Sequence, residues 1–372
     1  KLKTVDRKAK NIILLIGDGM GINQVTAYRI AKGGPNYISA FDKFAFSGLI
    51  KTHAVDTLIT DSAASATAYS TGIKTVNGYL GVNKDKQVVR NITEILHEKG
   101  YVTSLVATSE ITHATPAAFV VHNESRDNTD QIAEAMFRSN NFISLGGGRD
   151  FFVPKDLGGQ REDNFDILSL IKEQESYLES KDDFNNFQFD PSKRIFGLFA
   201  KEGFIREDNE PNLLEMFNFT LEQSKKMLAN NCAGFFIMTE GSQIDWEGHE
   251  NDFNGVFKEM DEFDQVVNRA LEYAKSDQNT LVIVLSDHET GGLLIETDDW
   301  NRDPEPSNKM KISWNTAVGL GTHTGTMIPA FAFGPGAENI AGVMDNTDIF
   351  FIMKEALGLD ELSDRQCSNK VK

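Results

Sequence analysis

The chain has 372 residues, of which 37 are basic and 55 acidic, so its formal net charge is −18. This balance argues against binding to a nucleic-acid backbone or an anionic membrane surface, because both need a basic footprint. The 40% hydrophobic content argues against intrinsic disorder, and the apolar runs are too short to cross a bilayer. At roughly 150 residues per domain, the length allows two domains or one large α/β domain with insertions.

In chain order, short apolar runs alternate with segments of helical spacing. We predict strands at residues 12–16, 102–107, 142–145, 235–238, 281–285 and 330–333, and helices at 61–72, 91–99, 130–138, 213–228 and 253–274. This alternation predicts an α/β three-layer sandwich, in which a central, mostly parallel sheet is flanked by helices on both faces.

Two segments interrupt the alternation. Residues 150–212 are rich in Asp, Glu, Asn and Lys and have few strand signals, so we expect a helical and looped insertion. Residues 298–320 predict a second, short insertion, and residues 360–372 a polar tail. Neither insertion has the composition of a domain with its own core, so we expect a single domain over residues 1–372.

The chain ends and the cysteines give weaker signals. Residues 1–10 are basic, with no initiator Met and no apolar signal core, which indicates either a removed signal peptide or a trimmed sequence. Cys232 lies beside an apolar run, whereas Cys367 lies in the polar tail. We therefore expect no structural disulfide between them, and low cysteine usage alone does not decide the compartment.

Acidic residues follow three of the predicted strands. Asp18 comes after the first strand, Glu240 after the strand at 235–238, and Asp287 after the strand at 281–285. The carboxyl ends of parallel strands lie along one edge of a sheet, so these side chains should converge. Three adjacent carboxylates repel one another unless cations neutralise them. An acid beside glycine is singly more often a cap, but the three together predict a metal site.

Histidines in the same segments add nitrogen ligands. Asp245 and His249 have the i,i+4 spacing that places both on one face of a helix, His288 follows Asp287, and His323 lies in a Gly-rich turn. With the three strand-end acids these give seven donors, more than one four-coordinate zinc ion needs, so two or more metals are implied. Imidazole with carboxylate suits Zn²⁺, whereas an oxygen-only set suits Mg²⁺.

Ser62 is a candidate nucleophile. It opens the helix predicted at 61–72, where free N–H groups and the helix dipole favour an anion. No histidine adjoins it in sequence, so a zinc ion that lowers the hydroxyl pKa is the economical activator. The helix by itself favours the plainer interpretation that Ser62 is a capping residue.

Two further segments bear on the same edge. His113 and Thr115 follow the strand at 102–107, and both are candidates for a magnesium shell, directly or through water. Arg126 could grip two phosphoryl oxygens bidentately. Taken alone, Arg126 is equally consistent with a surface side chain paired with Asp127 or Glu124.

Together these motifs resemble the alkaline phosphatase family, and within it a compact, bacterial, cold-active, zinc- and magnesium-dependent member. The matching segments occur in the family order and are GDGMG (17–21), DSAASAT (61–67), HATP (113–116), EGSQID (240–245), His249, SDH (286–288) and GTHTG (321–325). Any one motif is weak, whereas the set is specific.

The resemblance implies a function and a set of roles. Two zinc ions and one magnesium ion would serve the hydrolysis of phosphate monoesters through a phosphoserine on Ser62, with Arg126 gripping phosphate. The implied ligands are Asp245, His249 and His323 for one zinc, Asp18, Asp287, His288 and Ser62 for the other, and Asp18, Thr115 and Glu240 for magnesium. The family also implies a homodimer, in the periplasm or secreted, that acts on phosphate monoesters and binds inorganic phosphate.

Two positions depart from the best-studied bacterial relatives. His113 stands where they have Asp, and Trp246 stands where they have Lys. We expect weaker inhibition by phosphate and looser magnesium binding. The alternatives are a phosphodiesterase or phosphoglycerate mutase of the same superfamily, or a non-catalytic metal- or phosphate-binding protein.

Overall fold

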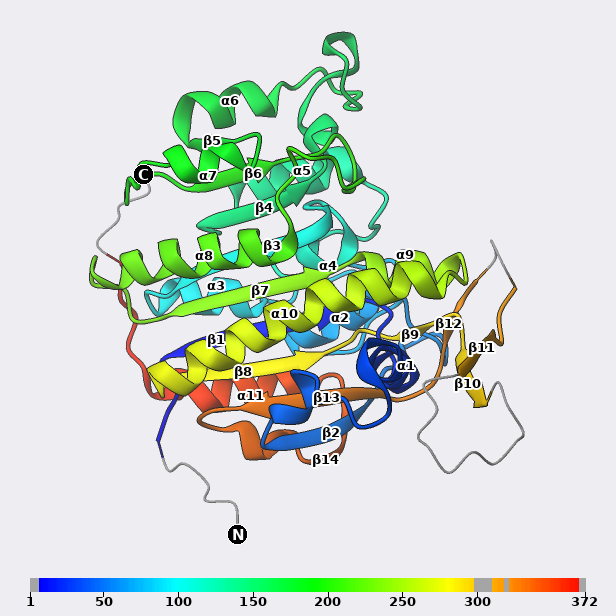
Figure 1. Cartoon of the computed structure of the whole chain (residues 1–372). Coiled ribbons are helices and arrows are strands. Elements are labelled where there is room, and N and C mark those ends of the chain that lie inside the picture. Colours follow the sequence, from blue (N-terminus) through cyan, green and yellow to red (C-terminus); the bar gives the residue numbers. More distant parts are fainter. Residues whose placement is uncertain (1–6, 298–309, 318–320, 368–372) are drawn as a thin grey trace.

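The computed structural model describes residues 7–297, 310–317 and 321–367, and its centre is one large sheet (Figure 1). Within these residues ten strands form the sheet. In spatial order they are β14 (Gly342–Asp345), β2 (Phe46–Lys51), β13 (Ile328–Phe333), β8 (Thr280–Leu285), β1 (Asn11–Gly17), β7 (Phe235–Gly241), β3 (Val102–Glu110), β4 (Ile143–Gly147), β6 (Ile195–Leu198) and β5 (Ser176–Leu178).

The sheet is parallel except at one strand. Among the described strands, β13 alone runs antiparallel to its neighbours β8 and β2. The central strands β8, β1 and β7 are buried along their whole length, which explains their continuous apolar sequences. The prediction of a mostly parallel sheet is confirmed, and all six predicted strands belong to it.

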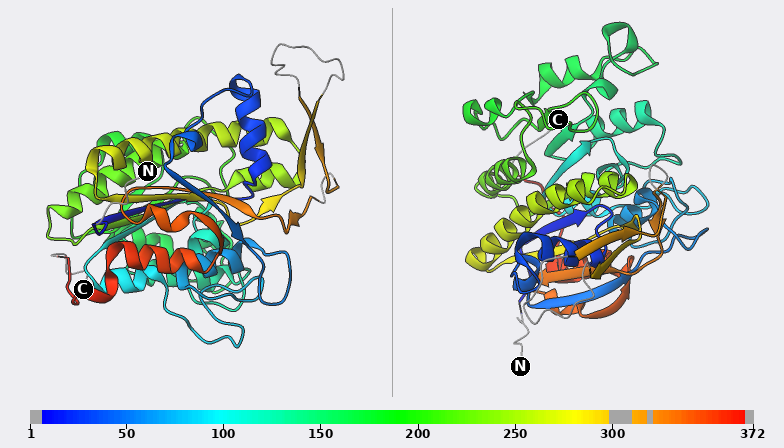
Figure 2. Two further views of the ribbon diagram at one scale, coloured as in Figure 1. Left: turned by 90° about the horizontal axis from the view of Figure 1, so that it is seen from below. Right: turned by 45° about the vertical axis from the view of Figure 1, so that its right-hand side comes forward.

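Helices cover both faces of the sheet (Figure 2). One face is covered by α1 (Ile22–Gly33), α8 (Leu213–Leu228), α9 (Gln243–His249) and α10 (Phe253–Asp277). The other face is covered by α2 (Ser62–Thr71), α3 (Ile92–Glu98), α4 (Ala114–Ala117), α5 (Thr129–Arg138), α6 (Ile167–Gln174) and α11 (Asp348–Leu357). Along β1, alternate side chains enter the two resulting cores. No helix among the described residues is long and apolar enough to span a bilayer.

The insertion expected at 150–212 contributes to the sheet. It contains the edge strands β5 and β6 together with α6, α7 (Asp182–Asn186) and two short 3-10 helices, η2 (Arg149–Phe152) and η3 (Lys155–Leu157). The strands are only three and four residues long, so they carry too little apolar periodicity to be recognised in the sequence. Buried Arg161 and Arg194 hold this region to α5, each donating to backbone carbonyls.

The remaining elements include two small antiparallel pairs and three short helices. The first pair is β10 (Leu293–Thr297) with β11 (Met310–Trp314), and the second is β9 (Glu289–Thr290) with β12 (His323–Thr324). The 3-10 helices are η1 (Phe41–Lys43), η4 (Ala337–Ile340) and η5 (Leu359–Glu361). Of the insertion predicted at 298–320, residues 298–309 and 318–320 lie outside the described residues.

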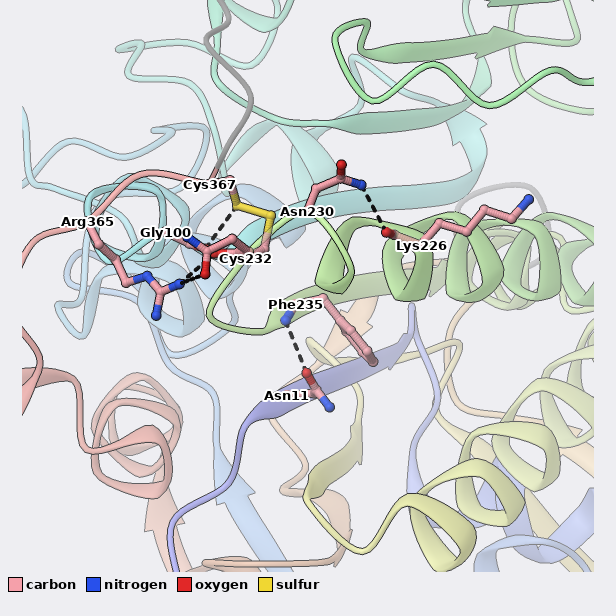
Figure 3. The surroundings of a disulfide bond; sticks show 9 residues. Asn11, Gly100, Lys226, Asn230, Cys232, Phe235, Arg365 and Cys367 are labelled. Atoms are coloured by element: carbon pink, nitrogen blue, oxygen red, sulfur yellow. Dashed lines mark hydrogen bonds between the residues drawn. A yellow bond between two sulfur atoms is a disulfide. The ribbon is translucent and has the colours of Figure 1, made fainter.

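The expectation that the cysteines remain unbridged is wrong. Cys232 and Cys367 form a disulfide across a sequence separation of 135 residues (Figure 3). The described part of the tail is exposed but lies along the surface of the protein, because Arg365 donates its backbone N–H to Glu98 and its guanidinium to Asn231. These contacts bring Cys367 to the amino-terminal end of β7, beside Cys232.

Candidate active site

The three strand-end acids converge as the sequence predicts. Asp18 follows β1, Glu240 lies at the end of β7 and Asp287 follows β8. Since β1 lies between β7 and β8, the three side chains share one edge of the sheet, and all three have zero exposed surface. Each has one carboxylate oxygen that takes part in no hydrogen bond among the described residues.

A first cluster consists of Asp245, His249 and His323. The two α9 residues lie one turn apart, with His249 Nε2 3.2 Å from Asp245 Oδ2. His323 comes from β12, and its Nε2 lies 3.5 Å from Asp245 Oδ1. One ligand atom from each residue lies within 4.8 Å of the other two, a spacing that can hold one metal ion.

A second cluster consists of Asp18, Asp287 and His288, all fully buried. His288 Nε2 lies 3.0 Å from Asp287 Oδ2 and 3.5 Å from Asp18 Oδ1. Ser62 Oγ points into this cluster, 3.2 Å from His288 Nε2 and 3.4 Å from Asp18 Oδ2. The candidate nucleophile and three candidate ligands thus meet at one point.

A third cluster consists of Asp18, His113 and Glu240, so Asp18 belongs to two clusters. Ser242 Oγ donates to Glu240 Oε2 over 2.7 Å, and the buried Thr115 hydroxyl lies beside the same carboxylate. Oxygen atoms dominate this set, which is the ligand type that magnesium prefers.

Without cations, the buried negative charges in the clusters are unfavourable. Burial, followed by the negative charges of Asp287 and Asp245, raises the pKa of Asp18. Burial also raises the pKa of Glu240 to about 7. Divalent cations would neutralise these buried carboxylates and would bind the carboxylate oxygens that take part in no hydrogen bond. The donor set therefore fits two ions with imidazole ligands and one with oxygen ligands.

Ser62 is the first residue of α2, and the N-cap is Asp61, so the interpretation of Ser62 as the capping residue is wrong. The Asp61 side chain accepts a hydrogen bond from the Ala64 N–H, and Gly72 ends the helix in the left-handed region at φ 76°. Ser62 is 2% exposed. Because Asp61 fills the capping position, the Ser62 hydroxyl is left to face the second cluster rather than its own helix.

Arg126 pairs with neither Asp127 nor Glu124, the two partners expected if it were a surface side chain. Its Nη1 lies 3.2 Å from Asp61 Oδ2, and its Nη2 donates to His113 Nε2 over 3.0 Å. Glu124 instead pairs with Lys86. Arg126 therefore connects Asp61, at the start of α2, with His113 of the third cluster.

Trp246 lies beside His113. The two rings meet edge to face, with centroids 6.2 Å apart. The indole also packs against Gly203, where any side chain would clash with it. No positive charge occupies this position.

Two residues were missed by sequence reasoning as parts of the site. Asp61 begins the helix predicted at 61–72, but its contact with Arg126 depends on the loop that carries the arginine. Thr290, two residues after His288, touches two clusters. In the sequence, the position of Thr290 two residues after His288 could have indicated that it belongs to the site.

Comparisons with known proteins identify the family of this chain. A sequence model of the family described as Alkaline phosphatase matches residues 9–312. Alkaline phosphatase 4 of Bacillus subtilis is 34% identical over an alignment that covers 93% of this chain and 89% of the relative.

Solved structures give the same result. Alkaline phosphatase from the Antarctic bacterium TAB5 is 35% identical, with a TM-score of 0.81 and coverage of 95% of this chain and 99% of that chain. A cold-active alkaline phosphatase from a psychrophilic Shewanella is 27% identical, with a TM-score of 0.79 and coverage of 93% and 99%. A variant of the TAB5 enzyme with a histidine replaced by aspartate was solved with magnesium bound in its M3 site. The chain belongs to the alkaline phosphatase family and is a phosphomonoesterase.

Proposed function

We propose that this enzyme hydrolyses phosphate monoesters through a phosphoserine on Ser62, with two zinc ions and one magnesium ion. The observation that carries this proposal is the buried Ser62 hydroxyl, 3.2 Å from His288 Nε2 and 3.4 Å from Asp18 Oδ2 at the amino end of α2. A non-catalytic binding protein would not need a nucleophile there. The relatives' names favour a monoesterase over the phosphodiesterase and mutase alternatives.

Three sets of residues would hold the cations. The first and second clusters combine imidazole with carboxylate and would hold zinc, whereas Asp18, Thr115 and Glu240 would hold magnesium. When bound, such cations supply positive charge that lowers the pKa of a hydroxyl group or water and offsets the charge of the phosphoryl group.

The chain's own residues would perform two in-line displacements. Ser62 Oγ forms a bond to phosphorus as the ester P–O bond breaks, and Arg126 donates to the phosphoryl oxygens. The N–H groups that open α2 add a favourable field for the anion. A water molecule then attacks phosphorus, and the bond to Ser62 breaks. Two displacements predict net retention of configuration at phosphorus.

His113 would act on the magnesium site through water. A guanidinium group only donates, so His113 Nε2 accepts from Arg126 and the proton of the neutral ring lies on Nδ1. Burial, followed by the charge of Arg126, lowers the pKa of His113 to about 3, which favours the neutral ring. A protonated nitrogen is a poor ligand, whereas Nδ1–H can donate to a water molecule held near Asp18 and Glu240.

The test compares Ser62→Ala with Ser70→Ala, which alters a hydroxyl on the same helix outside the clusters. Ser62→Ala should lower p-nitrophenyl phosphate hydrolysis by about three orders of magnitude or more and abolish acid-stable labelling by radioactive phosphate. Ser70→Ala should retain both. Chelation should remove activity, and metal analysis should find three ions per chain. Activity that survives chelation and Ser62→Ala, or at most one ion per chain, contradicts the mechanism.

The remaining expectations are also proposals. We infer a single domain, a homodimer, and a periplasmic or secreted location. The continuous sheet supports the single domain. The Cys232–Cys367 disulfide supports an oxidising compartment, and the homodimer rests on the family resemblance.

A further inference from the structure

Thr290 lies where three segments of the site meet. It is fully buried in β9, and its N–H donates to the Gly19 carbonyl over 3.3 Å. On its other side, α9 approaches closely through Gly248, where an added Cβ would lie 3.1 Å from the Thr290 Cβ. The side chain is therefore held between the loop after β1 and the helix that carries the first cluster.

The hydroxyl group of Thr290 touches one member of each zinc-type cluster. It donates to Asp245 Oδ1, a ligand candidate of the first cluster. It also lies 3.2 Å from His288 Nδ1, the ring nitrogen that faces away from the second cluster. A single hydroxyl thus joins the two clusters.

The direction of these hydrogen bonds fixes the tautomer of His288. An ionised Asp245 only accepts hydrogen bonds, so the single proton of the Thr290 hydroxyl goes to it. Towards His288 the hydroxyl oxygen can then only accept, which requires the proton on Nδ1. Nε2 is left bare, facing Ser62 and the two acids of the second cluster, as a metal ligand must be.

The other two histidines are fixed in a different way. His249 Nδ1 contacts the Gly321 carbonyl, and His323 Nδ1 contacts the Thr60 carbonyl over 2.9 Å. Backbone carbonyls accept regardless of their surroundings. Only for His288 is the partner a side chain, with a hydrogen-bond direction set by a residue of the first cluster.

We propose that Thr290 is a positioning residue that holds His288 as its Nδ1–H tautomer and links the metal affinities of the first and second clusters. This inference rests on the proposed function, because it assumes that both clusters bind zinc. In this proposal, Asp245 orients the Thr290 hydroxyl group, and the hydroxyl group orients the His288 imidazole.

The test compares three variants in zinc titrations against a chromogenic chelator. Thr290→Val keeps the side-chain shape but removes the hydroxyl, and should weaken zinc binding about 10–100-fold at both clusters, the usual cost of losing a partner of a metal ligand. Thr290→Ser keeps the hydroxyl and should stay within about threefold of the wild type. Thr316→Val removes a nearby hydroxyl that donates to Gly291 instead, and should also stay within about threefold.

A second measurement needs no variant. Long-range proton–nitrogen NMR spectra of the zinc-loaded wild type, labelled at histidine nitrogens, should show a proton on His288 Nδ1. The His288 signals are those missing from His288→Asn. A proton on Nε2 instead would overturn the proposal even if Thr290→Val failed to fold.

The outcomes separate this inference from the proposed function. Wild-type protein that binds no zinc contradicts the proposed function. Wild-type protein that binds two zinc ions, with Thr290→Val binding both as tightly, contradicts the role of Thr290 alone. Weakening at only one cluster contradicts the link, and equal weakening by Thr290→Ser assigns the effect to packing rather than to the hydroxyl.

Discussion

Arg126, His113 and Trp246 form a row of three side chains in the site. Arg126 donates a hydrogen bond to His113, and the indole of Trp246 meets the imidazole edge to face. In this row only the guanidinium carries a permanent positive charge, since burial lowers the pKa of His113 to about 3. Under the proposed function, binding of phosphate beside these side chains would depend on Arg126, the start of α2 and the cations.

Trp246→Lys should therefore strengthen inhibition by inorganic phosphate. An added ammonium group near the bound anion favours it by about 1 kcal/mol, so the inhibition constant should fall about fivefold. Steady-state assays with phosphate as competitor measure this. Trp246→Gln is the control, because it removes the ring without adding charge. An unchanged or higher constant for the lysine variant, relative to the glutamine variant, contradicts the argument.

At the scale of elements, α3 is fixed at its start by a capping box and a histidine. Asn91 and Glu94 bond reciprocally to each other's backbone N–H groups. The His122 ring bridges Glu94 Oε1 at 3.1 Å and the Gly81 carbonyl at 2.7 Å. Neutral imidazole has one N–H and cannot donate to both, so this bridge favours the protonated ring.

The pH dependence of this bridge follows from its pKa shifts. Burial opposes the charge of His122, but hydrogen bonds to Glu94 and Gly81 raise its pKa overall. Burial likewise opposes the charge of Glu94, but His122 and Asn91 lower its pKa overall. A raised histidine pKa stabilises the fold below about pH 6.5, and a lowered glutamate pKa stabilises it above about pH 4.3.

His122→Gln should accordingly cost more stability at about pH 6 than at about pH 9, where the wild-type ring has lost its proton. Because the glutamate is partly exposed, solvent screening limits the difference to roughly 0.5 kcal/mol. Urea unfolding of wild type and variant at both pH values measures it. His53→Gln, at an exposed position, is the control for loss of an imidazole. A larger cost at the higher pH would contradict the assigned direction.

The sequence predicts those elements and contacts that local patterns encode. The strands β1, β7 and β8 are continuous apolar runs that end in acids, and the parallel arrangement makes those acids meet. The Cys232–Cys367 bond and the Arg126–Asp61 contact could not be predicted, because each depends on how a polar loop or tail returns to the core. The role of Thr290 depends on the direction of hydrogen bonds, which spacing does not reveal.

At the scale of the whole molecule, the net charge of −18 is compatible with an anionic substrate. Four of the acids, Asp18, Glu240, Asp245 and Asp287, lie in the clusters. Three divalent cations would bring about six positive charges to this edge of the sheet. Attraction of phosphate is then local, so removing the cations should weaken substrate binding as well as turnover.

The disulfide acts on the molecule as a whole but away from the site. Closing a loop of 135 residues lowers the entropy of the unfolded chain, an effect of about 5 kcal/mol at most and more commonly 2–4. Reduction of the disulfide, or Cys367→Ser, should lower the free energy of unfolding by about 2–4 kcal/mol. Denaturant unfolding measures this loss.

Loss of the disulfide should not change the activity of the folded protein at low temperature. Cys232 precedes β7, whereas Glu240 lies about 20 Å away at the other end of this strand. Cys232→Ser should match Cys367→Ser, which controls for loss of either thiol. A large fall in kcat in the folded, reduced protein would show that the tail affects the clusters.

The reversed direction of β13 brings one residue of the first cluster, His323, to the site from a different part of the fold than the other residues of the clusters. Because β13 runs against β8, its beginning lies at the edge where its neighbours end, and His323 reaches the first cluster from the segment just before it. Asp18, Asp287 and His288 follow the central strands instead. Short segments outside the large sheet open by local unfolding at lower free energy than its central strands. We therefore expect His323, on the two-residue strand β12, to leave its cluster more readily than the ligands that follow the central strands.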